Sequence, residues 1–431
     1  MNTVQRLPDY DVVVAGGGPA GVCAGLAAAR AGMKTLVVEQ FNCLGGMSTI
    51  GIHQKIAVYN GAGGSPRIVG GIAKEIADRA VRDFEAEYRP GGLFVEIEGF
   101  KYLLDRMAEE AGLDLLYYTL VTDAVVEDGA VAGLTLTNKS GTFSVAAKRF
   151  VDCTGDADVA FRAGCRMMHG RAEDGRMQPV TLMYRVGGVH WPYTERYMHD
   201  HDPKLQDFCK RAAEAGLMGP WQSQLMGFWW IPSRPDQVGI NFTHMHLDGS
   251  SAFDLTRAAI EGRKQVREAV EAMRAMIPGF EKSYLIDTAA QIGVRETRRI
   301  FGEYVLTEDD LKGQTIFEDS IGLGAAFVDI HNTEGPGMDR RSGFDFPAGG
   351  YYSIPYRSLV PESVDNLLVA GRCHSVTHEA AGSTRWMTQC MVMGQAAGEA
   401  AALSIEDSAA PRGINIPTLQ ERLASGGAVL R

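Results

Sequence analysis

Three glycines near the start of the chain have the spacing of a phosphate-binding turn. Gly16, Gly18 and Gly21 form a G-x-G-x-x-G pattern, with Pro19 and Ala20 between the second and the third. Glycine at these positions permits a tight turn, a close approach of the backbone to a pyrophosphate, and close packing of a helix on a strand. We interpret the pattern as one half of a dinucleotide site.

An acidic residue follows at the distance that such a site requires. Glu39 lies about 20 residues beyond the glycines. Its carboxylate suits hydrogen bonds from ribose hydroxyls and repels a 2′-phosphate. The alternative is a glycine-rich turn in an unrelated α/β fold.

The surrounding elements place the glycines and the acid together. The β-branched run 11–15 predicts a buried strand that leads directly into the glycines. The alanine-rich stretch 20–31 predicts a helix, whose N-terminus would offer free N–H groups to a phosphate. Residues 35–38 predict a second strand. The expected fold class is α/β, with a Rossmann-like domain.

A second glycine pair follows the acid almost at once, in the L-G-G-M-S-T stretch 44–49. A simple NAD domain would normally start its next helix there, although the pair is also compatible with an ordinary turn. Here the sequence resembles glutathione-reductase-like flavoproteins, and more narrowly bacterial FAD-dependent oxidoreductases with L-G-G-x-x-T after the acid. The resemblance implies FAD as the cofactor, held in this region by Gln40, Gly45, Gly46, Met47 and Ser48.

Further stretches carry the same resemblance. It implies that the backbone near Val121 contacts the adenine, and that a strand ending in Thr154 and Gly155 lies beneath the dinucleotide. The run N-L-L-V-A-G-R at 366–372 resembles the strand that returns to the flavin in these proteins, which adds Gly371 and Arg372 to the expected cofactor site. A final helix over 386–403 begins beside Met387, and its dipole would stabilise negative charge on a reduced flavin.

The expected chemistry is hydride transfer between a substrate C–H and the flavin, which needs one proton carrier and groups that orient the substrate. Histidine suits the proton, and the family-like contexts favour His378 and His331. The stretch G-V-R-E-T-R-R-I at 293–300 resembles a signature of the same family, and its three arginines could bind a carboxylate or the flavin's phosphates, or could form a salt-bridged surface with Glu296 and Glu303. Arg385 and Arg298 are the candidates for binding an anionic group of the substrate or charge on the flavin. A structural role is the alternative for each histidine, as it is for His374.

The parts of the chain suggest a discontinuous organisation. Residues 1–170 and 348–405 are expected to form the FAD-binding domain, of glutathione-reductase type, with a parallel sheet and a small antiparallel layer from the runs within 113–147. Residues 171–347 are expected to be an inserted α+β substrate domain, and residues 406–431 a tail with one short helix.

Composition excludes several other classes. The net charge of −11 and the absence of basic runs argue against nucleic acid. No apolar run approaches the roughly 18 residues of a membrane helix, and we expect neither a membrane partner nor a secretion signal. The seven cysteines are scattered, which favours a reducing cytoplasm. His244 and His246 would share one face of a strand, but a third ligand is missing and no metal is expected.

The expected function is a dehydrogenase or reductase with a small-molecule substrate and an external electron donor or acceptor. A monooxygenase using external NAD(P)H is one alternative, although the strand ending A-G-R-C lacks the G-D-A-x-H run of aromatic hydroxylases. A non-redox protein of the same fold is another. The sequence leaves the substrate open, and it leaves a homo-oligomer open as well.

Overall fold

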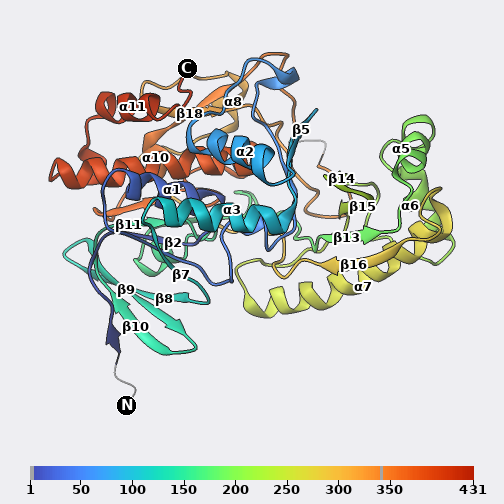
Figure 1. Ribbon diagram of the computed structural model, residues 1–431, viewed down its shortest axis with the longest axis horizontal. Helices are drawn as coiled ribbons and strands as arrows, with labels where there is room; N and C mark the ends of the chain where they lie inside the picture. Colours follow the sequence, from blue (N-terminus) through green and yellow to red (C-terminus); the bar gives the residue numbers. More distant parts are fainter. Residues whose placement is uncertain (1–3, 340–342) are drawn as a thin grey trace.

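The computed structural model describes residues 4–339 and 343–431, and a parallel sheet lies at its centre (Figure 1). Five strands pair in parallel in the order β20-β11-β2-β3-β7. Their buried β-branched residues pack on both faces, as a parallel sheet requires. This sheet confirms the predicted α/β class. The strands are β2 (Tyr10–Ala15), β3 (Thr35–Val38), β7 (Asp114–Leu116), β11 (Ala147–Asp152) and β20 (Leu367–Val369).

Helices cover one face of the sheet, on the side where Val12 and Val14 point. The helices α1 (Pro19–Arg30) and α10 (Met387–Glu406) lie side by side there (Figure 1). A Cβ atom on Gly394 would lie 2.0 Å from the carbonyl oxygen of Ala20, so the two helices touch through their backbones. The final helix predicted over 386–403 therefore packs directly against α1. The neighbouring helices are α2 (Gly71–Asp83) and α3 (Ile97–Glu110).

An antiparallel layer covers the opposite face, where Val13 and Ala15 point. It consists of β8 (Leu120–Glu127), β9 (Ala130–Asn138) and β10 (Gly141–Val145), with β1 (Gln5–Arg6) added in parallel to β10. One part of the expected layer is wrong. The stretch 113–118 instead supplies β7, which pairs with β3 at the edge of the parallel sheet because Leu115 and Leu116 pack on its two opposite faces.

A second unit stands to one side of the parallel sheet (Figure 1). Its four-stranded antiparallel sheet has the order β14-β15-β13-β16. The long helix α7 (Ala252–Met276) packs on this sheet, and Trp229 and Phe242 belong to the unit's apolar core. Its elements are β13 (Tyr184–Gly187), α5 (Trp191–Asp200), α6 (Gln206–Glu214), β14 (Gly227–Ile231), β15 (Arg234–Asn241), α7 (Ala252–Met276) and β16 (Tyr284–Thr288).

The chain returns from this second unit before residue 347. The strand β17 (Arg298–Ile300) pairs with β12 (Met167–His169), and β18 (Ser320–Gly324) pairs with β19 (Tyr352–Pro355). Leu306 already belongs to the core of the parallel sheet. The expected domain boundaries stay a prediction, and this packing favours an earlier return near residue 297.

Short elements complete the described chain. A three-stranded sheet borders α3, and α11 is the one helix of the expected tail. None of the helices within residues 4–339 and 343–431 combines the length and apolar character that a bilayer crossing requires. These elements are β4 (Lys55–Ile56), β5 (Glu87–Arg89), β6 (Gly92–Phe94), α4 (Asp158–Arg162), α8 (Glu308–Lys312), α9 (His378–Thr384) and α11 (Ile416–Ser425).

Candidate active site

Two adjoining cavities open at the carboxyl ends of the parallel strands. Both are lined by Gly18, Gly46, Thr154 and Gln291, so they form one elongated site. Ligands of open parallel sheets bind at this edge, beyond the ends of the strands. We call the smaller cavity, which includes Glu39, the cleft. The larger one has about 1190 Å³ of empty space, and we call it the chamber.

The cleft brings together the residues expected around the adenosine half of a dinucleotide. Glu39, at the end of β3, is 6% exposed and accepts hydrogen bonds from the backbone N–H groups of Gly17 (2.7 Å) and Phe41 (2.8 Å). Burial raises the pKa of Glu39 above its ordinary value. The predicted residues that line the cleft are Gly16, Gly18, Glu39, Gln40, Gly46, Val121 and Thr154.

The first glycines differ in what surrounds them. Gly16 has a φ of +93°, which glycine adopts without strain. A Cβ atom on Gly21 would lie 1.8 Å from the carbonyl oxygen of Gly16, so this glycine permits the turn to pack on the helix. A Cβ atom on Gly18 would meet nothing within 4 Å, and no side chain caps α1 there. The start of α1 is therefore open to an anionic ligand.

The second glycine pair bends the chain back onto α1. Gly45 and Gly46 have φ values of +102° and +51°. The hydroxyl of Ser48 donates to the carbonyl oxygen of Gly45 at 2.8 Å, which holds the turn. Gly46 and Met47 line the chamber, whereas Gly45 and Ser48 shape the loop from behind.

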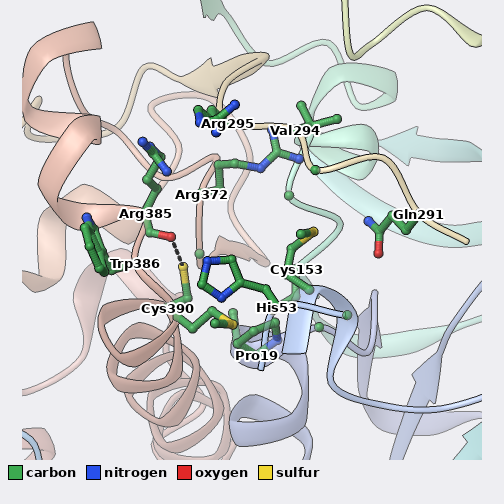
Figure 2. Close-up of a pocket in the computed structure, with 18 of the residues that line it drawn as sticks. Pro19, His53, Cys153, Gln291, Val294, Arg295, Arg372, Arg385, Trp386 and Cys390 are labelled. Carbon is green, nitrogen blue, oxygen red and sulfur yellow. Dashed lines mark hydrogen bonds between the residues drawn. The ribbon is translucent and has the colours of Figure 1, made fainter. Parts of the chain in front are cut away.

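The far wall of the chamber comes from the C-terminal segment. Gly371, Arg372 and Met387 line it, together with Pro19 and Ala20 from the start of α1 (Figure 2). The loop after β20 and the N-terminus of α10 therefore face the chamber, as expected.

Arg372 occupies the space that the missing side chain of Gly155 leaves free. A Cβ atom on Gly155 would lie 2.9 Å from Nη2 of Arg372. The same guanidinium donates to Asp156 at 2.7 Å and to the Thr297 hydroxyl at 3.1 Å. Gly155 lines the chamber, but it makes room for this arginine rather than for the dinucleotide directly.

The structure separates the four residues expected to be catalytic. Only Arg385 lines the chamber, where it donates to the carboxylate of Asp329 at 2.8 Å. Arg298 lies outside and binds Asp158 at 2.6 Å. The expected position of Arg298 at the substrate is therefore wrong.

The two favoured histidines also lie behind the wall of the chamber. Nδ1 of His378 is 2.8 Å from the buried carboxylate of Glu296. His331 is 3% exposed, and its Nε2 atom lies 3.6 Å from Asp329. Neither ring lines the chamber or the cleft, so a direct proton transfer by either histidine is not supported. The third candidate, His374, is fully buried as well.

Several chamber residues carried no local signal in the sequence. His53 stacks on Trp229 with ring centroids 4.9 Å apart, and burial lowers its pKa to about 4, so the imidazole is neutral at pH 7. It follows the second glycine loop and is brought inward by β4. Other such residues come from the second unit and its return segment: Thr181, Met183, Asn241 and Gln291. Arg295, from the arginine-rich stretch 293–300, also lines the chamber.

Comparison with known proteins identifies the class of this enzyme. Residues 11–423 match the family of FAD dependent oxidoreductases, and the chain belongs to that family. The open start of α1, the buried Glu39 and the adjoining chamber all fit the diphosphate, ribose and ring of FAD. The protein is an FAD-dependent enzyme.

Individual relatives are distant. The chain is 31% identical over 164 residues to the thiamine thiazole synthase of Methanococcus aeolicus, covering 35% of this chain and 57% of the relative. It is 29% identical over 264 residues to the digeranylgeranylglycerophospholipid reductase of Thermoplasma volcanium, covering 57% and 60%. The matched stretches thus span less than two thirds of either relative.

Among solved structures, a geranylgeranyl bacteriochlorophyll reductase-like protein from Thermoplasma acidophilum aligns with a TM-score of 0.47 and 16% identity, covering 98% of this chain and 83% of that one.

Proposed function

We propose that this enzyme transfers a hydride between a small organic substrate and N5 of FAD, as a dehydrogenase or reductase. The observation that supports it is the mixed lining of the chamber. Pro19, Gly371 and Met387 come from the segments expected to hold FAD, whereas Asn241 and Arg295 come from the second unit and its return segment (Figure 2). A substrate on the second group of residues would face a flavin on the first.

Bound FAD supplies the hydride acceptor or donor. Residues of this chain have the remaining tasks of binding, orientation and proton movement. His53 is the histidine that lines the chamber within the described residues, and its lowered pKa keeps the imidazole neutral at physiological pH. A ring nitrogen is then free to accept a hydrogen bond from the substrate or, as a weak base, its proton. Arg385, held by Asp329, orients the substrate. Trp386 and Met183 exclude water from the same space.

We further propose the glutathione-reductase type of arrangement, with the second unit as the inserted substrate domain. The sequence has a single G-x-G-x-x-G unit between a strand and a helix. Electrons are therefore expected to be exchanged with an external donor or acceptor rather than with a second built-in dinucleotide domain.

A second candidate is a use of FAD without net redox chemistry. The similarity to a thiamine thiazole synthase favours it, since that relative is named for a synthesis rather than for a reduction. It predicts a protein that binds FAD but whose flavin keeps its oxidation state with every organic compound offered.

An anaerobic screen tests the proposal. We expect the purified protein to show the flavin absorption near about 450 nm, and one group of small organic compounds to bleach it or to reoxidise the reduced form. His53→Gln should slow this step roughly 100-fold or more while retaining FAD, and exposed His190→Gln should not. Rapid bleaching by NADPH alone would favour the monooxygenase alternative, and a colourless protein would refute the proposal.

A further inference from the structure

Among the described residues, three arginines and Lys55 line the chamber, and two of the arginines have carboxylate partners. Arg372 binds Asp156 at 2.7 Å, and Arg385 binds Asp329 at 2.8 Å. Arg295 is different. Within residues 4–339 and 343–431, no carboxylate lies within ion-pair distance of its guanidinium, although the side chain is only 6% exposed. The chamber therefore holds at least one positive charge without a direct counter-ion.

The polar contacts of Arg295 are neutral. Its Nη1 atom donates to the carbonyl oxygen of Pro179 at 2.6 Å, and its Nη2 atom approaches Oδ1 of Asn241 at 3.5 Å. Burial and the nearby Arg385 charge lower the pKa of Arg295 to about 9, while the Asp329 carboxylate, which lies beyond ion-pair distance, acts in the opposite direction. A buried cation without a partner is costly, and a bound anion removes that cost.

Other groups on the chamber wall also lack a partner. Oε1 of Gln291 and Nε of Arg385 are buried and make no hydrogen bond to any described residue. Both residues line the chamber, as Arg295 does (Figure 2). Buried polar atoms in folded proteins are almost always satisfied, so these two atoms indicate a polar ligand beside Arg295.

Apolar side chains complete the same space. Met183, Val294 and Trp386 line the chamber. In Figure 2, Arg295 and Pro19 lie at opposite sides of the cavity, with Arg372, His53 and Cys153 between them. The space between the guanidinium and the start of α1 therefore has both polar and apolar walls. A ligand that fits has one anionic end and a hydrocarbon body.

We propose that the chamber is a binding site for an organic acid, whose carboxylate is bound by Arg295 and whose apolar body lies between Arg295 and the flavin. The proposal rests on the proposed function and specifies its substrate class. The guanidinium of Arg295 can bind a carboxylate through two parallel hydrogen bonds. Lys55 also lines the chamber and adds a second positive charge that favours an anionic ligand.

Paired probes test this directly. The FAD-loaded protein is titrated by calorimetry and by flavin absorbance with acetate, benzoate and cinnamate, and in parallel with the three neutral amides of the same shape. We expect at least one acid to bind roughly tenfold or more tightly than its amide. Arg295→Gln should abolish that preference and leave the amide affinities unchanged, whereas Arg295→Lys should restore part of it.

A matched variant controls for nonspecific loss of charge. Arg274 belongs to α7 of the second unit and, like Arg295, donates to a backbone carbonyl, that of Ser283. It lies outside the chamber, so Arg274→Gln should keep the acid preference. Equal binding of every acid and its amide, or an acid preference that survives Arg295→Gln, would overturn the inference.

The test separates this inference from the proposed function. If the wild-type protein binds FAD and is bleached by an organic compound but shows no preference for acids over amides, only the organic-acid site is refuted. A protein that takes up no FAD would refute the proposed function, and calorimetry on the same FAD-free protein would still decide whether Arg295 selects acids.

Discussion

Gly18 and Gly21 belong to one motif but meet different neighbours. The space over Gly18 is free of protein atoms, and its φ of −68° is open to any residue. The space over Gly21 is filled by the carbonyl group of Gly16, 1.8 Å from where a Cβ atom would lie. The first glycine therefore serves the ligand, and the second serves the fold.

Alanine at these two positions should have opposite effects. We expect Gly18→Ala to weaken FAD binding by about tenfold or more with little change in the stability of the FAD-free protein, because the added methyl group occupies cofactor space. We expect Gly21→Ala to destabilise the fold by about 3 kcal/mol or more, because the turn and α1 must separate.

Fluorescence titration with FAD and thermal unfolding of the FAD-free variants measure the two effects. If Gly18→Ala lowered the stability of the FAD-free protein as strongly as it weakened FAD binding, the glycine would be required by the fold rather than by the ligand.

Single residues were predictable where their role is set by neighbours in the sequence. Gly16, Gly18 and Glu39 lie within one strand-turn-helix-strand segment, and all three line the cleft. His53 had no such signal, because β4 and the second unit bring it inward. The segment 293–300 drew attention to its arginines, but only the folded chain shows that Arg295 turns inward while Arg298 binds Asp158.

At the scale of elements, the contact between α1 and α10 supports both walls of the site. Gly394 and Gly398 leave space for the carbonyl oxygens of Ala20 and Ala24, which lie 2.0 Å and 2.3 Å from the positions of the missing Cβ atoms. Any side chain at Gly394 would push α10 away from α1 and displace Met387, which begins α10 at the chamber.

We expect Gly394→Ala to lower the free energy of unfolding by roughly 1 to 3 kcal/mol, the usual cost of overpacking a core, and to weaken FAD binding as well. Urea unfolding and FAD titration measure the two quantities. Gly413→Ala is the control, since a Cβ atom there meets nothing within 4 Å, and it should change stability by less than about 0.5 kcal/mol. A stable Gly394→Ala protein would contradict the close contact.

Long or strongly patterned elements were predictable, and short ones were not. The alanine-rich stretch 20–31 forms α1, and the stretch 386–403 forms α10. Both are long enough, and rich enough in small helix-forming residues, to be recognised from composition alone. The strand β7 has three residues, too few to show a periodicity, and its place was decided by pairing with β3. The short helix α9, with His378 at its start, gave no separate signal either.

At the scale of the whole molecule, four histidines are held neutral. Burial lowers the pKa of His53 and His331 to about 4, and that of His244 and His374 to about 3. An unfolded chain protonates its histidines near pH 6.5. Between about pH 6.5 and 4 the unfolded chain therefore binds more protons than the folded protein, and stability falls as the pH falls.

We expect the free energy of unfolding to decrease near pH 5 by roughly 1.4 kcal/mol per pH unit for each of these histidines. Urea unfolding of the FAD-loaded protein at several pH values measures this slope. The variant His374→Gln should reduce this slope by the contribution of one histidine, about 1.4 kcal/mol per pH unit. The variant His190→Gln, at an exposed histidine, should leave the slope unchanged. A slope that is the same in His374→Gln would show that His374 is protonated in the folded protein.

The organisation of the molecule was predictable only in outline. The parallel sheet, the antiparallel layer and the closing C-terminal helix followed from local patterns. The composition of the chamber did not, because it joins residues as distant as Pro19, Asn241 and Met387. The point near residue 297 at which the chain leaves the second unit could not be predicted for the same reason. Only tertiary packing shows that Leu306 belongs to the core of the parallel sheet.

The strand β20 and the helix α10 follow the other four strands of the parallel sheet in the chain, and this order has a consequence for biosynthesis. Until they emerge, β11 lacks a neighbour on one side and the small-residue face of α1 is bare. Domains that complete themselves early can fold during translation, but this one cannot. We therefore expect the nascent chain to take up its cofactor only after α10 has been synthesised, and to depend on chaperones until then.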